Sequence, residues 1–144
     1  MANQCIFCSI VSRTAPASIV FEDDKTLAFV DLRQVNPGHV LVIPKIHIND
    51  VRELDQETGS ALMQSVSQVT RAVGRAFPNN GISLWHSIGE AAFQEVPHMH
   101  IHIHPRLDND NVLRVYEELP ENVDFETRER YAAMVRQELH GLQT

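Results

Sequence analysis

The sequence has few cysteines, no cluster of lysine and arginine, and no long apolar segment, and each shortage excludes a class of protein. No apolar run approaches the roughly 20 residues of a membrane-spanning helix, and the N-terminus lacks the basic start and apolar core of a secretory signal. Nineteen acidic against twelve basic side chains give a formal net charge of -7, which disfavours general binding to nucleic acid polymers and anionic membranes. We therefore expect a cytoplasmic protein that holds any anionic ligand by local groups, with no nucleic acid or membrane partner.

The length and composition fit one globular domain with its own hydrophobic core. The chain has 144 residues, of which 43% are hydrophobic and 22% charged. A chain of this length buries roughly 68–70% of the surface that its unfolded form exposes, so it needs no disulfide to fold. Proline and glycine occur singly between periodic segments, without a repeat or a linker. The sequence therefore predicts a single domain over residues 1–144.

Hydrophobic periodicity predicts more strands than helices. The clearest helix covers residues 56–77, where apolar side chains recur every three to four positions at Leu62, Val66, Val69 and Val73. A final helix follows Asp124, which can cap it, and its apolar stripe is Tyr131, Val135, Leu139 and Leu142. The remaining expected elements are a short helix over 5–11 and strands over 18–21, 26–31, 39–43, 81–85 and 97–103. Because strands and helices do not alternate, we expect an α+β domain with an antiparallel sheet.

Cys5 and Cys8 are the only cysteines, and they stand in a C-x-x-C spacing. In an intracellular protein this spacing is typical of a metal knuckle or of a redox pair. Two small buried side chains on a first helical turn are a third interpretation. The spacing alone leaves all three open.

Four of the eight histidines alternate with apolar residues: His98, His100, His102 and His104. In a strand, residues two apart share a face and lie about 6.5–7 Å apart, so these imidazoles would form one row. Such a row is costly to bury without partners, so it lines a cleft, binds metal or faces water. Two neighbouring imidazoles suit phosphoryl transfer, because a neutral ring attacks phosphorus while a protonated ring donates to the phosphate or the leaving group. We expect such a pair to share its protons, with one ring neutral and one cationic.

The histidine segment and its surroundings resemble the histidine triad (HIT) family. Residues 98–103, HMHIHI, match the pattern H-φ-H-φ-H-φ-φ, in which φ is apolar. Further matching blocks are CIFC at 5–8, EDD at 22–24, LAF at 27–29, PGHVLVIPK at 37–45 and QEVP at 94–97. The resemblance runs from Cys5 to Arg106, about seven tenths of the chain, and is closest to the branch of small histidine triad nucleotide-binding proteins.

This resemblance implies a fold, an assembly and an activity. Each protomer would have a five-stranded antiparallel sheet with one long helix, a family-like core over residues 5–106 and a C-terminal extension with a helix over 107–144. Two protomers would join their sheets in a homodimer. Members of this branch hydrolyse small nucleoside 5'-phosphoramidates or related nucleotide conjugates, so the expected ligand is a purine nucleotide or its conjugate.

The resemblance also implies roles for individual residues. His100, the middle histidine, would be the nucleophile that forms a nucleotidyl-histidine intermediate, and His102 would contact the phosphate and the departing group. Asp31 would bind the ribose hydroxyls. The other implied nucleotide contacts are Ile6, Phe7, Phe29 and Leu32 around the base, Ser87, and the phosphate-loop residues Gln94, Glu95 and Val96.

Bacterial-type members of the family hold a structural zinc ion, and the matching residues in this chain are Cys5, Cys8, His47 and His98. Two thiolates and two imidazoles form a common tetrahedral zinc site. The resemblance therefore implies a bound structural zinc, whereas the catalytic step requires no cofactor.

Several positions depart from the family pattern. Phe93 stands where glycine is usual, Ser87 where asparagine is usual, and Ile88 where a polar residue is common. His104 replaces the last apolar residue of the motif, but the triad still begins at His98, because a triad that began at His100 would place Pro105 and Arg106 at apolar positions. Three further histidines receive no chemical role: His39, His86 and His140.

Three other functions stay open. A dinucleoside polyphosphate hydrolase would differ in the size of the leaving group. A nucleotide-binding regulatory protein with little turnover would explain the changes at Phe93 and Ser87. A metal-handling protein would use the histidine row itself.

Overall fold

The structure is a computed structural model that describes residues 4–112 and 116–142. Its contacts divide the chain into two compact units, Met1–Val112 and Leu113–Thr144, and each is described by itself. The first unit contains two helices, α1 (Ile6–Val11) and α2 (Gln56–Ala76), and the short 3₁₀ turns η2 (Val51–Glu53) and η3 (Glu90–Ala92). Its strands are β1 (Ile19–Glu22), β2 (Thr26–Val30), β3 (Val40–Pro44), β4 (Gly81–Trp85) and β5 (Ile101–Arg106).

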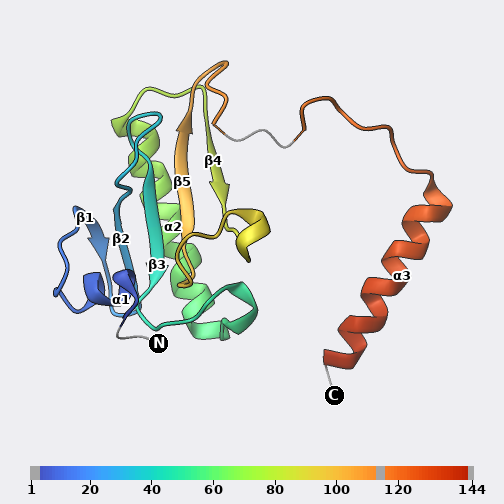
Figure 1. The fold of residues 1–144 in the computed structure, drawn as a ribbon, viewed down its shortest axis with the longest axis horizontal. Coiled ribbons are helices and arrows are strands. Elements are labelled where there is room, and N and C mark those ends of the chain that lie inside the picture. Colours follow the sequence, from blue (N-terminus) through green and yellow to red (C-terminus); the bar gives the residue numbers. More distant parts are fainter. Residues whose placement is uncertain (1–3, 113–115, 143–144) are drawn as a thin grey trace. The chain divides into compact units, whose positions relative to one another are not determined.

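The five strands form one antiparallel sheet in the order β1-β2-β3-β5-β4 (Figure 1). The helix α2 and the strand β4 separate β3 from β5 in the sequence, yet β3 and β5 are neighbours in the sheet. The long connection thus brings the histidine segment beside β3. This architecture confirms the expected α+β fold with a five-stranded antiparallel sheet.

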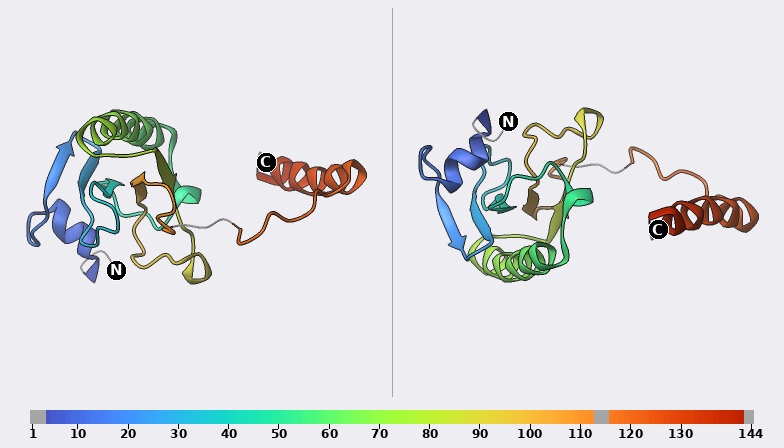
Figure 2. Two further views of the ribbon diagram at one scale, coloured as in Figure 1. Left: turned by 90° about the horizontal axis from the view of Figure 1, so that it is seen from above. Right: turned by 90° about the horizontal axis from the view of Figure 1, so that it is seen from below.

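The two faces of the sheet pack against different helices (Figure 2). On one face, Val42 and Ile103 pack with the apolar stripe of α2 that the sequence predicts, Leu62, Val66, Val69 and Val73. On the other face, Phe29 and Leu41 pack with residues of α1. Because side chains alternate along a strand, His102, which pairs with Leu41, points to the α1 face. The candidate site therefore lies on the face of the sheet away from α2.

The strand β5 begins later than the sequence predicts. It covers Ile101–Arg106, so His98 and His100 precede it and the expected strand over 97–103 is wrong in its first half. Pro97 has no N–H to donate to a strand ladder, and the backbone N–H of Met99 donates to the carbonyl of Ile48 at 2.7 Å, away from β3. The four imidazoles therefore do not form one continuous row.

The second unit contains the helix α3 (Phe125–Leu142). The expected cap is present, because the backbone N–H of Thr127 donates to Oδ1 of Asp124 at 2.8 Å. The apolar stripe of α3 is exposed in the single chain, and no described residue of the helix is buried. Across the described residues, none of the helices combines the length and the apolar character that a membrane crossing requires.

Candidate active site

His100 lies just before β5 and is buried, with 6% of its surface exposed. Its Nδ1 lies 2.7 Å from the carbonyl oxygen of His98. A carbonyl only accepts, so Nδ1 donates and the lone pair of the neutral ring is on Nε2. The Phe7 ring packs perpendicular to the imidazole, with ring centroids 5.2 Å apart. The backbone carbonyl of His98 thus fixes the tautomer in which Nε2 carries the lone pair.

His102 follows on β5, and its ring centroid lies 4.9 Å from that of His100. Burial, together with the nearby His100 and His39 rings, lowers the pKa of His102 to about 3. Burial also lowers the pKa of His100, an effect that its hydrogen bond to the His98 carbonyl partly offsets. In the ligand-free chain both rings are therefore neutral near pH 7. The expectation that one ring is cationic is wrong for this state, because desolvation disfavours the charged imidazole.

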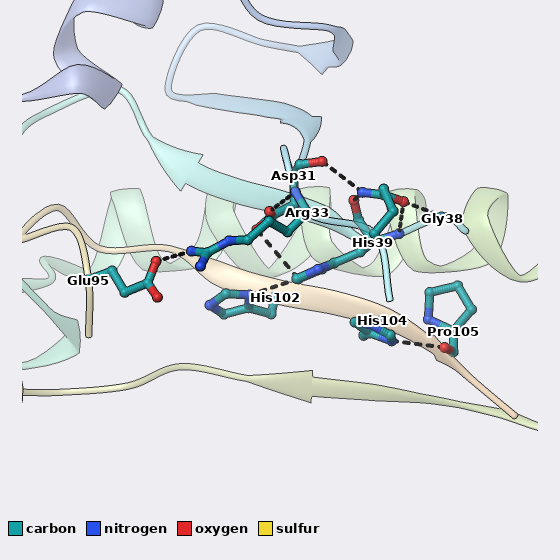
Figure 3. Close-up of polar contacts among 9 residues, drawn as sticks. Asp31, Arg33, Gly38, His39, Glu95, His102, His104 and Pro105 are labelled. Atoms are coloured by element: carbon teal, nitrogen blue, oxygen red, sulfur yellow. Dashed lines mark hydrogen bonds and ion pairs between the residues drawn. The ribbon is translucent and has the colours of Figure 1, made fainter. Parts of the chain in front are cut away.

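His39, which received no role from the sequence, is the direct partner of His102 (Figure 3). Its Nε2 lies 2.9 Å from Nδ1 of His102 and 3.8 Å from Oδ2 of Asp31. Burial lowers the pKa of His39, although the Asp31 carboxylate raises it again in part. On its other side, His102 stacks on Trp85 with ring centroids 4.4 Å apart and an angle of 10° between the planes. The sequence did contain a signal: His39, directly before β3, stands two residues before Leu41, which pairs with His102, and therefore lies on the same face as His102.

His86 is a second histidine that the sequence argument missed. Its Nδ1 lies 3.2 Å from the carbonyl oxygen of His100, and its Nε2 accepts a hydrogen bond from the backbone N–H of Val51 at 3.2 Å. A ring that accepts at Nε2 carries its proton on Nδ1, so it donates to the His100 carbonyl. His86 thus ties the backbone of the proposed nucleophile to the turn η2. No sequence pattern relates these three positions.

The predicted base contacts divide into core and surface residues. Phe7 and Phe29 are buried and meet edge to face, with ring centroids 5.3 Å apart. Ile6 is 51% exposed and Leu32 is fully exposed. Phe7 therefore packs against both Phe29 and His100, whereas Ile6 and Leu32 present apolar surface to solvent.

The predicted ribose ligand, Asp31, stands at the end of β2. Its Oδ1 accepts a hydrogen bond from the backbone N–H of Arg33 at 2.8 Å. Its side chain is 16% exposed. Oδ2 faces His39, 3.8 Å from its Nε2.

The predicted phosphate loop includes Ser87, Gln94, Glu95 and Val96. The side chain of Gln94 braces the loop, because Oε1 accepts from the backbone N–H of Gly89 at 2.9 Å and Nε2 donates to the carbonyl of Asn49 at 2.8 Å. Glu95 forms an ion pair with Arg33 (Figure 3). Val96 packs against the apolar cluster that contains Phe7, and Ser87 is partly buried after β4.

Phe93 adopts a left-handed backbone conformation with φ 64° and ψ 33°. Left-handed residues with a side chain are strained, whereas glycine is not. The side chain is 86% exposed, so packing does not compensate for the strain. Phe93 thus has φ and ψ values that glycine adopts without strain, although it carries a large side chain.

Cys5, Cys8, His47 and His98 come together at one end of the sheet, and their ligand atoms all lie within 4.8 Å of one another. Sγ of Cys5 is 3.4 Å from Nδ1 of His98, and Sγ of Cys8 is 3.3 Å from Nδ1 of His47. A tetrahedral zinc ion with ordinary bond lengths separates sulfur and nitrogen ligands by about 3.5 Å. Nε2 of His98 donates to the carbonyl of Pro44 at 2.8 Å, so the lone pair of this imidazole is on Nδ1, the nitrogen that faces the cysteines. The donor set and its tautomer therefore suit zinc.

Without a metal, two of these ligands, Cys8 and His98, are neutral near pH 7. Burial, together with the neighbouring Cys5, raises the pKa of Cys8 to about 11. Burial lowers the pKa of His98 to about 4. Metal binding at this cluster would therefore release thiol protons, as is usual for zinc sites with thiolate ligands.

Comparison with known proteins gives the same family as the site. The HIT domain profile matches residues 12–109. Protein hit of Bacillus subtilis (strain 168) is 42% identical over 105 residues, which cover 73% of this chain and 72% of that protein. An adenosine 5'-monophosphoramidase of Schizosaccharomyces pombe is 37% identical over 111 residues, which cover 77% of this chain and 80% of that enzyme. A crystal structure of a HIT-family protein from Bacillus subtilis has a TM-score of 0.87 at 33% identity, over 93% of this chain and 96% of that one.

The histidine triad beside β3 and these similarities together show that the chain belongs to the HIT family, in its branch of small histidine triad nucleotide-binding proteins.

Proposed function

We propose that this protein hydrolyses small nucleoside 5'-phosphoramidates through a nucleotidyl intermediate on His100. The observation that carries the proposal is the 2.7 Å hydrogen bond between Nδ1 of His100 and the His98 carbonyl. It leaves the lone pair on Nε2, and the lowered pKa of the ring keeps that lone pair free at neutral pH. The similarity to an adenosine 5'-monophosphoramidase supports this substrate class.

The reaction follows from these groups in two displacements. In the first, Nε2 of His100 forms a bond to the α-phosphorus while the phosphorus–nitrogen bond of the substrate breaks and the leaving amine takes a proton. In the second, water attacks the same phosphorus, the bond to His100 breaks, and the nucleoside monophosphate leaves as the water loses a proton. Each displacement is easier than one direct hydrolysis.

His102 is the proposed proton donor to the leaving amine. Its pKa of about 3 belongs to the ligand-free chain, in which burial and the neighbouring histidine rings disfavour the charged imidazole. A bound phosphate places negative charge beside the ring and raises its pKa, because an opposite charge favours the protonated form. Substrate binding itself would therefore charge the ring that the reaction needs.

We propose that Cys5, Cys8, His47 and His98 hold a structural zinc ion. The site is closed, with four protein ligands, so the ion would not contact substrate. Its contribution is to tie α1 to the residues that follow β3 and to the segment before β5. Because the His98 carbonyl holds the His100 ring, this bracing would also fix the nucleophile.

We further propose that the protein is a homodimer in which two sheets join at their edges. The sheet ends in the strand β4 on one side, where Leu84 is 47% exposed. An edge strand offers unpaired backbone groups to a second copy. Sedimentation velocity would then give twice the 16.3 kDa of the chain, and a monomer at micromolar concentration would contradict this assembly.

Phe93 favours a second candidate, a nucleotide-binding protein with little turnover. Its strained, left-handed backbone lies next to Gln94, in the loop that approaches the phosphate in the proposed complex. If this loop limits catalysis, Phe93→Gly will raise the turnover number without changing the affinity for AMP.

The test measures AMP release from adenosine 5'-phosphoramidate by the wild type, by His100→Ala and by a matched control, His140→Ala on α3. We expect His100→Ala to bind AMP normally but to lose activity by about 10³-fold or more, as removal of a nucleophile does. Rapid quenching under alkaline conditions and peptide mass analysis should locate an adenylyl group on His100. Wild type that binds AMP and releases none, from this substrate or from a dinucleoside polyphosphate, would favour the second candidate.

A further inference from the structure

Asp31, His39 and His102 form a second group of metal-ligating side chains, apart from the cluster that contains the cysteines. Their ligand atoms all lie within 4.8 Å of one another. From this geometry we propose that the group binds a divalent transition cation, such as Zn²⁺ or Co²⁺, when no nucleotide is present.

The distances are close to those that such an ion requires. A tetrahedral ion with bonds of about 2.0–2.2 Å to nitrogen and oxygen places its ligands about 3.4 Å apart. In the structure Nε2 of His39 is 2.9 Å from Nδ1 of His102 and 3.8 Å from Oδ2 of Asp31. Shifts of about 1 Å or less in each side chain would therefore accommodate the ion.

The surroundings hold these side chains in the required orientation. Trp85 stacks on His102 at 4.4 Å, and His104 packs against His39 with ring centroids 4.5 Å apart. The backbone N–H of Arg33 donates to Oδ1 of Asp31, which leaves Oδ2 facing the histidines. Ligands that are held by neighbouring groups in this way lose little freedom when a metal binds.

The chemistry of the group also favours a cation. A hydrogen bond between two ring nitrogens requires that one of them, either Nε2 of His39 or Nδ1 of His102, carries no proton. When an ion enters, the bridging proton moves to the far nitrogen of its own ring, and both facing nitrogens present lone pairs. Two imidazoles and one carboxylate suit borderline ions such as Zn²⁺, Co²⁺ and Cu²⁺, and leave further positions for water.

Metal and nucleotide would exclude each other. This consequence rests on the proposed function, in which Asp31 accepts the ribose hydroxyls and His102 contacts the phosphate. A carboxylate oxygen that coordinates an ion is no longer free for a ribose hydroxyl. A free transition metal would therefore act as a competitive inhibitor, without contact to His100.

The experiment adds Co²⁺ to the nucleotide-free full-length chain after one equivalent of zinc has filled the cysteine cluster. We expect one further equivalent of cobalt, with visible d–d absorption and no thiolate-to-cobalt charge-transfer band. His39→Asn and Asp31→Asn should each weaken this binding by about tenfold or more. The matched control is His140→Leu on α3, which removes an exposed histidine outside the three-residue group and should leave cobalt affinity unchanged.

Three results would overturn the proposal: no second equivalent, a thiolate band, or unchanged affinity in His39→Asn. If a variant does not fold, paramagnetic broadening in the wild type decides, because the ring signals of His39 and His102 must broaden before those of His86 and His140. AMP should raise the apparent Kd for cobalt. Cobalt that binds as described while bound AMP fails to displace it would keep the metal site and contradict the ribose role of Asp31.

Discussion

The replacement His104→Leu should stabilise the protein, although it removes a buried residue of the histidine segment. His104 is 1% exposed, and its Nδ1 donates to the carbonyl of Pro105 at 2.9 Å. Its Nε2 is buried without a hydrogen-bond partner among the described residues. An unsatisfied buried polar atom costs about 1–3 kcal/mol.

The leucine would leave no new unsatisfied group behind. The Pro105 carbonyl also accepts a hydrogen bond from Nδ2 of Asn36 at 3.0 Å, so it keeps a partner. The loss of the ring contacts to His39 and Trp85 costs about 0.5–1.5 kcal/mol, which offsets part of the gain. The net expectation is a stabilisation of about 1 kcal/mol, or roughly 2–4 °C in Tm.

Urea unfolding at pH 7.5 in zinc-containing buffer measures this change, with the same m-value required for both proteins. His140→Leu on the exposed helix α3 is the matched control and should change the free energy of unfolding by less than about 0.5 kcal/mol. A His104→Leu variant that is less stable than wild type by about 1 kcal/mol or more would refute the reasoning. It would mean that Nε2 of His104 has a partner, such as a bound ion or water.

Three further changes test other parts of the structure. Burial lowers the pKa of His102 below that of the unfolded chain, so the unfolded chain binds a proton first as the pH falls. The free energy of unfolding should therefore be highest above about pH 6.5 and fall by about 2 kcal/mol by pH 5. Urea unfolding should show this pH dependence in wild type and a weaker one in His102→Asn. Phe93→Val should lower the free energy of unfolding by about 1 kcal/mol, because a β-branched residue tolerates the left-handed conformation poorly. Phe93→Gly should change it little, because the relief of backbone strain is offset by the greater conformational freedom of the unfolded chain. Equal urea midpoints for the two variants would contradict backbone strain at Phe93. Chelation of zinc should lower stability by about 4 kcal/mol relative to protein in free zinc at 1,000 times its Kd, and Cys8→Ser should abolish that difference in calorimetry.

The sequence predicts most of the sheet and the long helix because these elements depend on local periodicity. The expected helix over 56–77 and the observed α2 differ by one residue, and the expected and observed bounds of β4 agree. The start of β5 could not be predicted, because it depends on a backbone hydrogen bond from Met99 to Ile48, far away in the sequence. The alternation of histidine and apolar residues by itself predicted a strand that started at Pro97.

The site shows the same division between local and distant information. His100 and His102 follow from their spacing, whereas the partnership of His39 with His102 arises only when β3 and β5 become neighbours. The grouping of Cys5 and Cys8 with His47 and His98 likewise depends on three separate segments, and only the family resemblance pointed to it. The residue type at position 93 does not predict a left-handed backbone, because phenylalanine rarely adopts that conformation.

The alternation of faces along β5 has a consequence for how this protein can change. Ile101 and Ile103 belong to the packing against α2, while His102 and His104 belong to the opposite face. Losing or gaining a single residue in this strand would exchange the two sets, placing imidazoles in the apolar interior and isoleucines on the face of the candidate site. Insertions and deletions here should therefore be far more harmful than point changes.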